Sequence, residues 1–135
     1  MTRATESTII IVTGARHWTD RVTVWRALEA ASPHLVVQGG CPRGADKIAW
    51  YWARHKRIPC ETFHAEWTLG NFAGPARNRR MLRAHPSARV LAFPLGGPGT
   101  ADCILAAREL GMSVTIFEPR KTSPSERRAQ RSNAR

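Results

Sequence analysis

The sequence has few cysteines, few acidic residues and no long hydrophobic run. No apolar segment approaches the ~20 residues that a membrane-spanning helix needs, and the polar stretch at residues 1–7 lacks the apolar region of a signal peptide. The three cysteines have no zinc-type spacing and the five histidines are scattered. We therefore expect a cytoplasmic protein in a reducing environment, with no metal site, no resident cofactor and no membrane partner.

Acidic residues are outnumbered by basic ones, 10 to 21, which gives a net charge of +11. Such a balance suits an anionic partner, small or polymeric, although a solvated arginine-rich surface explains the scattered charges equally well. Residues 119–135 are basic, have no periodicity and have no apolar side chain larger than alanine or proline. We predict one domain over residues 1–118 and a disordered basic tail over 119–135, which can bind nucleic acid non-specifically.

Apolar runs alternate with segments of helical spacing along the domain. Strands are predicted at residues 8–13, 35–38, 60–64, 89–93 and 113–117. Helices are predicted at about 20–32, at 45–56, from about 74 to before Pro86, and at 101–110, with Pro75 at the first position of the third. This order predicts an α/β fold of three layers, with helices on both faces of a five-stranded, mainly parallel sheet.

The most informative loop is Pro94–Thr100, which reads Pro-Leu-Gly-Gly-Pro-Gly-Thr between a predicted strand and a predicted helix. Glycines allow a tight turn and a close approach of the backbone to a ligand. The free N–H groups and the dipole of the following helix favour an anion, most often phosphate. A loop of this kind can also serve only to turn the chain.

Other loops that follow strands open on the same edge of a parallel sheet, where ligands bind in such folds. Arg77 lies in a first helical turn, which the dipole disfavours by ~0.3–1 kcal/mol, so we expect Arg77 to face a bound anion. A surface charge or an ion pair with Asp46 or Asp102 is the alternative. Trp67 can stack on a base or simply pack in the core. The predicted ligand-binding residues are Gly14, Arg16, Gly40, Arg43, Gly44, Trp67, Asn78, Gly96, Gly97, Gly99 and Thr100.

These motifs resemble those of the SLOG superfamily. The segment Pro94–Thr100 is similar to its Pro-Gly-Gly-x-Gly-Thr signature, and the stronger resemblance, to the small YspA/YpsA-related SLOG proteins, covers most of the chain from Ile9 to Phe117. The matching motifs are Val12-Thr13-Gly14-x-Arg16, Asp20, Gly39–Asp46, Ala65–Trp67 and Gly74–Met81. The resemblance implies a Rossmann-like fold, a homodimer and binding of a nucleotide or nucleotide-derived ligand, as a sensor or carrier.

Two other functions follow from related groups. In the Lonely guy phosphoribohydrolases, a glutamate three residues after the motif threonine serves the chemistry. Cys103 stands at that position here, with Asp102 one residue, or ~100° of helix, away. The resemblance gives Arg77, Asp46 and Asp102 as catalytic candidates for N-glycosidic hydrolysis of a nucleoside monophosphate, and we expect Cys103 to be a buried residue and not a nucleophile. A single-stranded nucleic-acid binder, resembling DNA-processing protein A, is the third hypothesis.

Overall fold

The computed structural model describes residues 8–121, which form a five-stranded parallel sheet in the order β3-β2-β1-β4-β5. The strands are β1 (Ile9–Gly14), β2 (Leu35–Gln38), β3 (Cys60–Thr62), β4 (Arg89–Phe93) and β5 (Val114–Ile116). The helices are α1 (Arg21–Ala31), α2 (Ala45–Lys56), the 3-10 helix η1 (Trp67–Phe72), α3 (Ala73–Ala84) and α4 (Pro98–Glu109). The predicted α/β architecture is confirmed.

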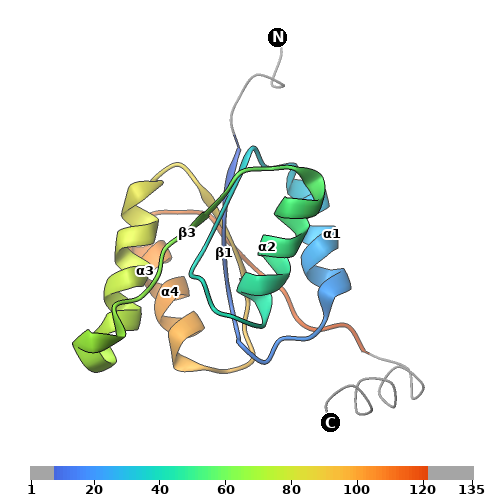
Figure 1. Ribbon diagram of the computed structural model, residues 1–135. Coiled ribbons are helices and arrows are strands. Elements are labelled where there is room, and N and C mark those ends of the chain that lie inside the picture. The colour runs from blue at the N-terminus through green and yellow to red at the C-terminus, as the bar shows by residue number, and fades with distance from the viewer. Residues whose placement is uncertain (1–7, 122–135) are drawn as a thin grey trace.

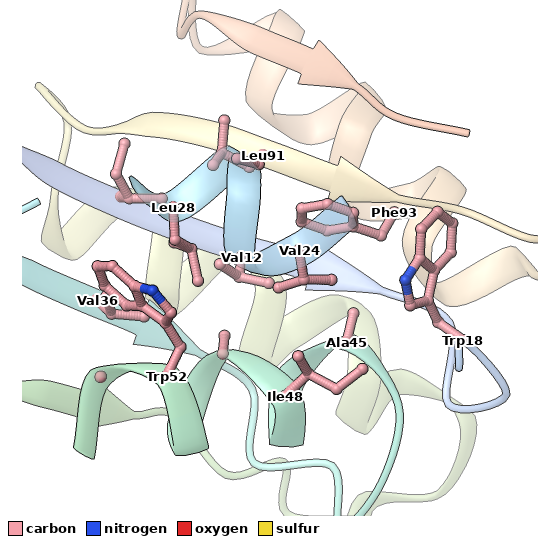
Figure 2. Close-up of a cluster of buried hydrophobic side chains, with 14 residues drawn as sticks. Val12, Trp18, Val24, Leu28, Val36, Ala45, Ile48, Trp52, Leu91 and Phe93 are labelled. Atoms are coloured by element: carbon pink, nitrogen blue, oxygen red, sulfur yellow. The ribbon is translucent and has the colours of Figure 1, made fainter. Parts of the chain in front are cut away.

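Helices cover both faces of the sheet, with α1 and α2 on one side and α3 and α4 on the other (Figure 1). The central strand β1 divides its side chains between these layers. Ile10 packs with the buried residues of α1 and α2, as does Val12 (labelled in Figure 2), whereas Ile11 packs with those of α3 and α4. All three are fully buried, which explains why β1 reads as a continuous apolar run.

Aromatic side chains join the end of β4 to the first loop and to the chain after β5. The ring of Trp18 meets that of Phe93 edge to face at 5.3 Å between centroids, and Phe117 stacks on Phe93 at 5.0 Å. The chain then continues to Arg120, whose Nε and backbone N–H donate to the carboxylate of Asp20 at 2.8 Å. Residues 122–135, most of the predicted tail, lie outside the described part of the chain.

Several predicted bounds are wrong by a few residues. Helix α4 begins at Pro98 and not at residue 101, because proline at a first helical position loses no hydrogen bond. Helix α3 begins at Ala73, so Pro75 is its third residue. The edge strands β3 and β5 have three residues each, shorter than predicted. Within residues 8–121, no helix combines the length and hydropathy that would let it cross a lipid bilayer.

Candidate functional site

A cavity of about 730 Å³ opens where β1, β2 and β4 end. Its walls come from the segments that follow these three strands, together with the region from His64 to Trp67 and the start of α3. This volume is within the range of small-molecule sites. The cavity therefore lies at the carboxyl edge of the parallel sheet, where ligands bind in folds of this type.

Most of the predicted site residues meet in this cavity. Those that line it are Gly14, Arg16, Gly40, Arg43, Asp46, Trp67, Arg77, Asn78, Gly97, Gly99 and Thr100. Three predicted residues, Gly44, Gly96 and Asp102, do not line it.

Gly44 and Gly96 allow backbone conformations with a positive φ that other residues rarely adopt. Gly44 precedes α2 with φ +78° and ψ −155°, a conformation essentially limited to glycine. A Cβ there would lie 2.2 Å from the carbonyl oxygen of Ala15, so the first loop can pack on the start of α2 only because Gly44 has no side chain. Gly96 has φ +88° and turns the chain before α4.

The start of α4 presents unpaired amides to the cavity. Gly97 caps this helix without a side-chain hydrogen bond, and Pro98 has no N–H to offer. The N–H groups of Gly99 and Thr100 find no acceptor among residues 8–121. A Cβ at Gly97 or Gly99 would meet no atom within 4 Å. Unpaired donors, open space and the positive end of the helix dipole are the features that favour an anion at a helix start.

Arg77 reaches from α3 across the cavity floor to the ends of β2 and β3. Its Nη1 donates to the carbonyl oxygens of Gly39 at 2.6 Å and Phe63 at 3.2 Å, and its Nε donates to Oδ1 of Asn78 at 2.9 Å. Its hydrogen-bond partners are thus two backbone carbonyls and the Asn78 side-chain amide, not the carboxylates of Asp46 or Asp102. One edge of the guanidinium is fixed before any ligand arrives, which lowers the ordering cost of binding.

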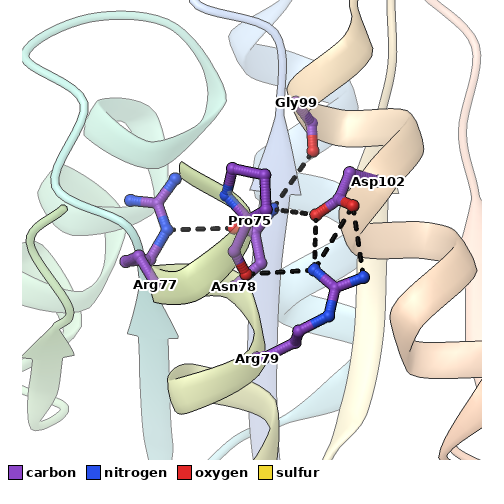
Figure 3. A network of polar contacts seen from close by, with 6 residues as sticks. All are labelled: Pro75, Arg77, Asn78, Arg79, Gly99 and Asp102. Atoms are coloured by element: carbon purple, nitrogen blue, oxygen red, sulfur yellow. Dashed lines mark hydrogen bonds and ion pairs between the residues drawn. The ribbon is translucent and has the colours of Figure 1, made fainter. Parts of the chain in front are cut away.

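Asn78 connects this arginine to α4 (Figure 3). The residue is 2% exposed, and its Nδ2 donates to the carbonyl oxygen of Gly99 at 3.3 Å and to Oδ2 of Asp102 at 3.1 Å. Asp102 also forms an ion pair of 3.1 Å with Arg79. These contacts direct the Asp102 carboxylate toward α3, which explains why it does not line the cavity.

Asp46 is the carboxylate at the cavity floor. It is 6% exposed, and its Oδ2 accepts a hydrogen bond of 3.3 Å from the backbone N–H of Cys41. Burial raises the pKa of Asp46 to about 6, against the opposing effects of the Cys41 amide and the Arg77 charge. The carboxylate therefore fixes the loop that follows β2 and stays mostly ionised at neutral pH.

Cys103, at the position of the phosphoribohydrolase glutamate, is fully buried in the core between the sheet and α3 and α4, as expected. Burial raises the pKa of its thiol to about 11, so it carries almost no thiolate at neutral pH. Within the described range, no three His, Cys, Asp or Glu side chains gather closely enough to hold a metal ion.

Sequence reasoning missed two residues beside the loop after β2. A Cβ at Gly39 would lie 2.3 Å from Nη1 of Arg77, so only glycine leaves room for the guanidinium. The imidazole of His64 lines the cavity directly beside Gly40. The Gly39-Gly40 pair in the sequence could have indicated Gly39. His64 was missed because the predicted strand at residues 60–64 included it, whereas β3 ends at Thr62.

The sheet order, the two helical layers and the cavity define a Rossmann-like α/β protein. Residues 8–70 match the YspA, cpYpsA-related SLOG family. The chain is also 41% identical over 119 residues to the "Gene 61 protein" of Mycobacterium phage D29, an alignment that covers 80% of this chain and 94% of that protein. The chain therefore belongs to the YspA, cpYpsA-related SLOG family, as its motifs predicted.

Proposed function

We propose that the protein binds a nucleotide or nucleotide-derived phosphate ligand in this cavity, as a sensor or carrier. The observation that carries the proposal is the start of α4. The N–H groups of Gly99 and Thr100 have no acceptor within residues 8–121 and border open space. This arrangement fits a phosphate without rearrangement of the backbone.

Two arginines at the rim add positive charge. Arg16 and Arg43 are exposed, line the cavity and form no ion pair with another residue between 8 and 121. Their guanidinium groups are therefore available to phosphate oxygens, which they match in geometry. Trp67 lines the same cavity and is 65% exposed, so a base can stack on its ring.

The arrangement favours binding over N-glycosidic hydrolysis. Hydrolysis needs a carboxylate close to the ribose, and Asp46 is the one carboxylate among the lining residues. Its Oδ2 is already bonded to the Cys41 amide, and Asp102 is paired with Arg79 outside the cavity. If chromatography detected the release of free base from any of a panel of nucleoside monophosphates, hydrolysis would be favoured over binding alone.

Thermal shift with nucleoside monophosphates and ADP-ribose-like compounds tests the proposal. A ligand that binds only the folded state at 100 times its Kd adds about 2.7 kcal/mol to the free energy of unfolding, so the melting temperature should rise. Gly97→Val should abolish the rise, because the valine side chain fills the space open to a phosphate.

The backbone at Gly97, with φ −77° and ψ 153°, accepts any residue, so Gly97→Val should fold normally. Gly111→Ala, at a position outside the cavity, is the control and should keep the rise. A well-folded wild-type protein whose melting temperature responds to no nucleotide in the panel would contradict the proposal.

A further inference from the structure

The solvent side of α2 carries cations and aromatic rings that the cavity does not use. Lys47, Trp50, Tyr51 and Arg54, here called the α2 stripe, share one face of the helix because they lie three or four residues apart. The Lys47 ammonium is 4.2 Å from the ring centroid of Trp50 and 5.2 Å from that of Tyr51. The Arg54 guanidinium is 5.3 Å from the Trp50 centroid.

The charges of the stripe have no acidic partner in the described part of the chain. Lys47 and Arg54 form no ion pair there, and their contacts are with ring faces. The acid on the same helix, Asp46, is buried in the cavity floor, and Glu29 on α1 is paired with Lys56. The stripe therefore presents two uncompensated positive charges on a protein whose net charge is +11.

The two aromatic rings of the stripe lie beside these charges and are not part of the hydrophobic core. Trp50 and Tyr51 meet edge to face at 5.1 Å between centroids. Tyr51 is 55% exposed and Trp50 is partly exposed. The apolar residues that attach α2 to the sheet, such as Ile48 and Trp52, lie on the other face. Exposed rings between cations are the combination that binds single-stranded nucleic acid, through base stacking and phosphate contacts.

We propose that the α2 stripe is a binding surface for single-stranded nucleic acid. A base stacks on the exposed ring of Tyr51, and backbone phosphates pair with Lys47 and Arg54, which Trp50 holds beside it. An anionic membrane would also attract the cations, but a membrane-binding helix needs a broad apolar face for the lipid. The apolar face of α2 is buried against the sheet. The stripe lies outside the nucleotide cavity, so this binding is independent of the proposed function.

Fluorescence anisotropy of labelled single-stranded oligonucleotides, titrated with the full chain at several salt concentrations, tests the proposal. Stacking on an aromatic side chain contributes ~1–3 kcal/mol per base, so Tyr51→Ala should weaken binding by about 5-fold or more and leave the salt slope unchanged. Lys47→Ala with Arg54→Ala should reduce the slope of log K against log salt by about 1.4, since each phosphate contact to a single strand contributes ~0.7.

The matched control is Arg83→Ala with Arg108→Ala, which removes two exposed arginines from α3 and α4. In this control, the loss of affinity and the change of the salt slope should each be less than half of those in the Lys47/Arg54 double variant. Trp50→Phe retains a ring and should stay within about 2-fold of wild type. An unchanged melting temperature verifies that each variant is folded. If Tyr51→Ala does not fold, Tyr51→Ser is used in its place.

Three results would overturn the proposal. The first is wild-type affinity in both Tyr51→Ala and the Lys47/Arg54 variant. The second is an equal loss in the Arg83/Arg108 control, which would assign the binding to net charge alone. The third is tighter binding to anionic phospholipid vesicles than to oligonucleotides, abolished by Tyr51→Ala, which would make the stripe a membrane contact.

Discussion

Asp46 shows how a single buried carboxylate can hold the loop after β2 in place and at the same time reduce stability. The loop after β2 must leave room for Arg77 and must follow Gly39 and Gly40 into the start of α2. A carboxylate that accepts the Cys41 amide holds this path. Its burial is unfavourable for the ionised form, as the pKa of about 6 shows.

The raised pKa of Asp46 predicts a pH dependence with a definite sign. Between its ordinary pKa of 3.8 and its folded value of about 6, the folded protein binds more protons at this group than the unfolded chain does. The Asp46 contribution to the free energy of unfolding should therefore fall as pH rises through this window, by up to about 3 kcal/mol.

Urea unfolding of wild type and Asp46→Asn at pH 4, 5, 6 and 7 isolates this group, because the other carboxyls titrate alike in both proteins. The variant should gain stability relative to wild type as pH rises from 4 to 6 and then level off. A constant difference across the four pH values would show that Asp46 titrates with its ordinary pKa.

At the scale of single elements, the close packing of α2 depends on glycines at both sides of the contact. A Cβ at Gly14, the last residue of β1, would lie 2.4 Å from Cβ of Ala45, the first residue of α2. Gly44 meets the backbone of Ala15 in the same way. The start of α2 therefore lies directly against the end of β1, where the cavity begins.

Gly44→Ala should lower the free energy of unfolding more than Gly111→Ala, although both glycines have a positive φ. Gly44 and Gly111 have φ of +78° and +74°, and a Cβ at Gly111 would meet no atom within 4 Å. Gly111→Ala should cost about 1 kcal/mol for its backbone conformation, and Gly44→Ala should cost at least about 2 kcal/mol more, because the first loop must move. Equal urea midpoints for Gly44→Ala and Gly111→Ala would show that the first loop moves away from the new Cβ at no cost in stability.

The elements that the sequence predicted best are those with the strongest local signals. The apolar run of β1 was placed within one residue at each end, and α2 was placed correctly, because both depend on burial, which the hydrophobic pattern reports. The helix η1 was expected as an irregular connection, because its residues Trp67–Phe72 are exposed and show no periodicity. The start of α4 was placed too late because glycines were read as loop residues.

The site could be predicted in outline but not in its contacts. Loops after parallel strands meet at one edge, so the convergence of Arg16, Arg43 and Gly99 followed from topology. Two of the acceptors of Arg77 are the backbone carbonyls of Gly39 and Phe63. Because every residue has a carbonyl, no side chain in the sequence marks these two.

At the scale of the whole molecule, the chain after β5 is attached to the first loop through Asp20. This carboxylate also caps α1, where it accepts from the backbone N–H of Thr23 at 3.2 Å. Burial acts to raise the pKa of Asp20, but the hydrogen bonds from Arg120 and Thr23 outweigh it and lower the pKa to about 2. The link between residues 20 and 120 thus depends on an ionised carboxylate.

Two truncations should separate this link from the basic residues beyond it. Removal of 122–135 should leave the melting temperature at pH 7 unchanged, whereas removal of 119–135 should lower the free energy of unfolding by about 1–3 kcal/mol, because Asp20 loses Arg120.

The difference between the two truncated proteins should shrink as pH falls from about 4 toward 2, where Asp20 becomes protonated. Differential scanning calorimetry measures both effects. If the two proteins melt together at pH 7, the Arg120 contact contributes nothing to stability. If the shorter truncation also loses stability, residues beyond 121 take part in the fold.

The position of β1 at the centre of the sheet has a consequence for the order in which the chain is synthesised. The strand emerges first and pairs with β2 soon afterwards, but its other neighbour, β4, emerges only after α1, α2, β3 and α3. Until then the isoleucine-rich strand keeps one edge bare, and a bare edge is a template for another chain. A nascent chain stalled before Arg89 would expose the most apolar strand of the protein to its neighbours on the ribosome.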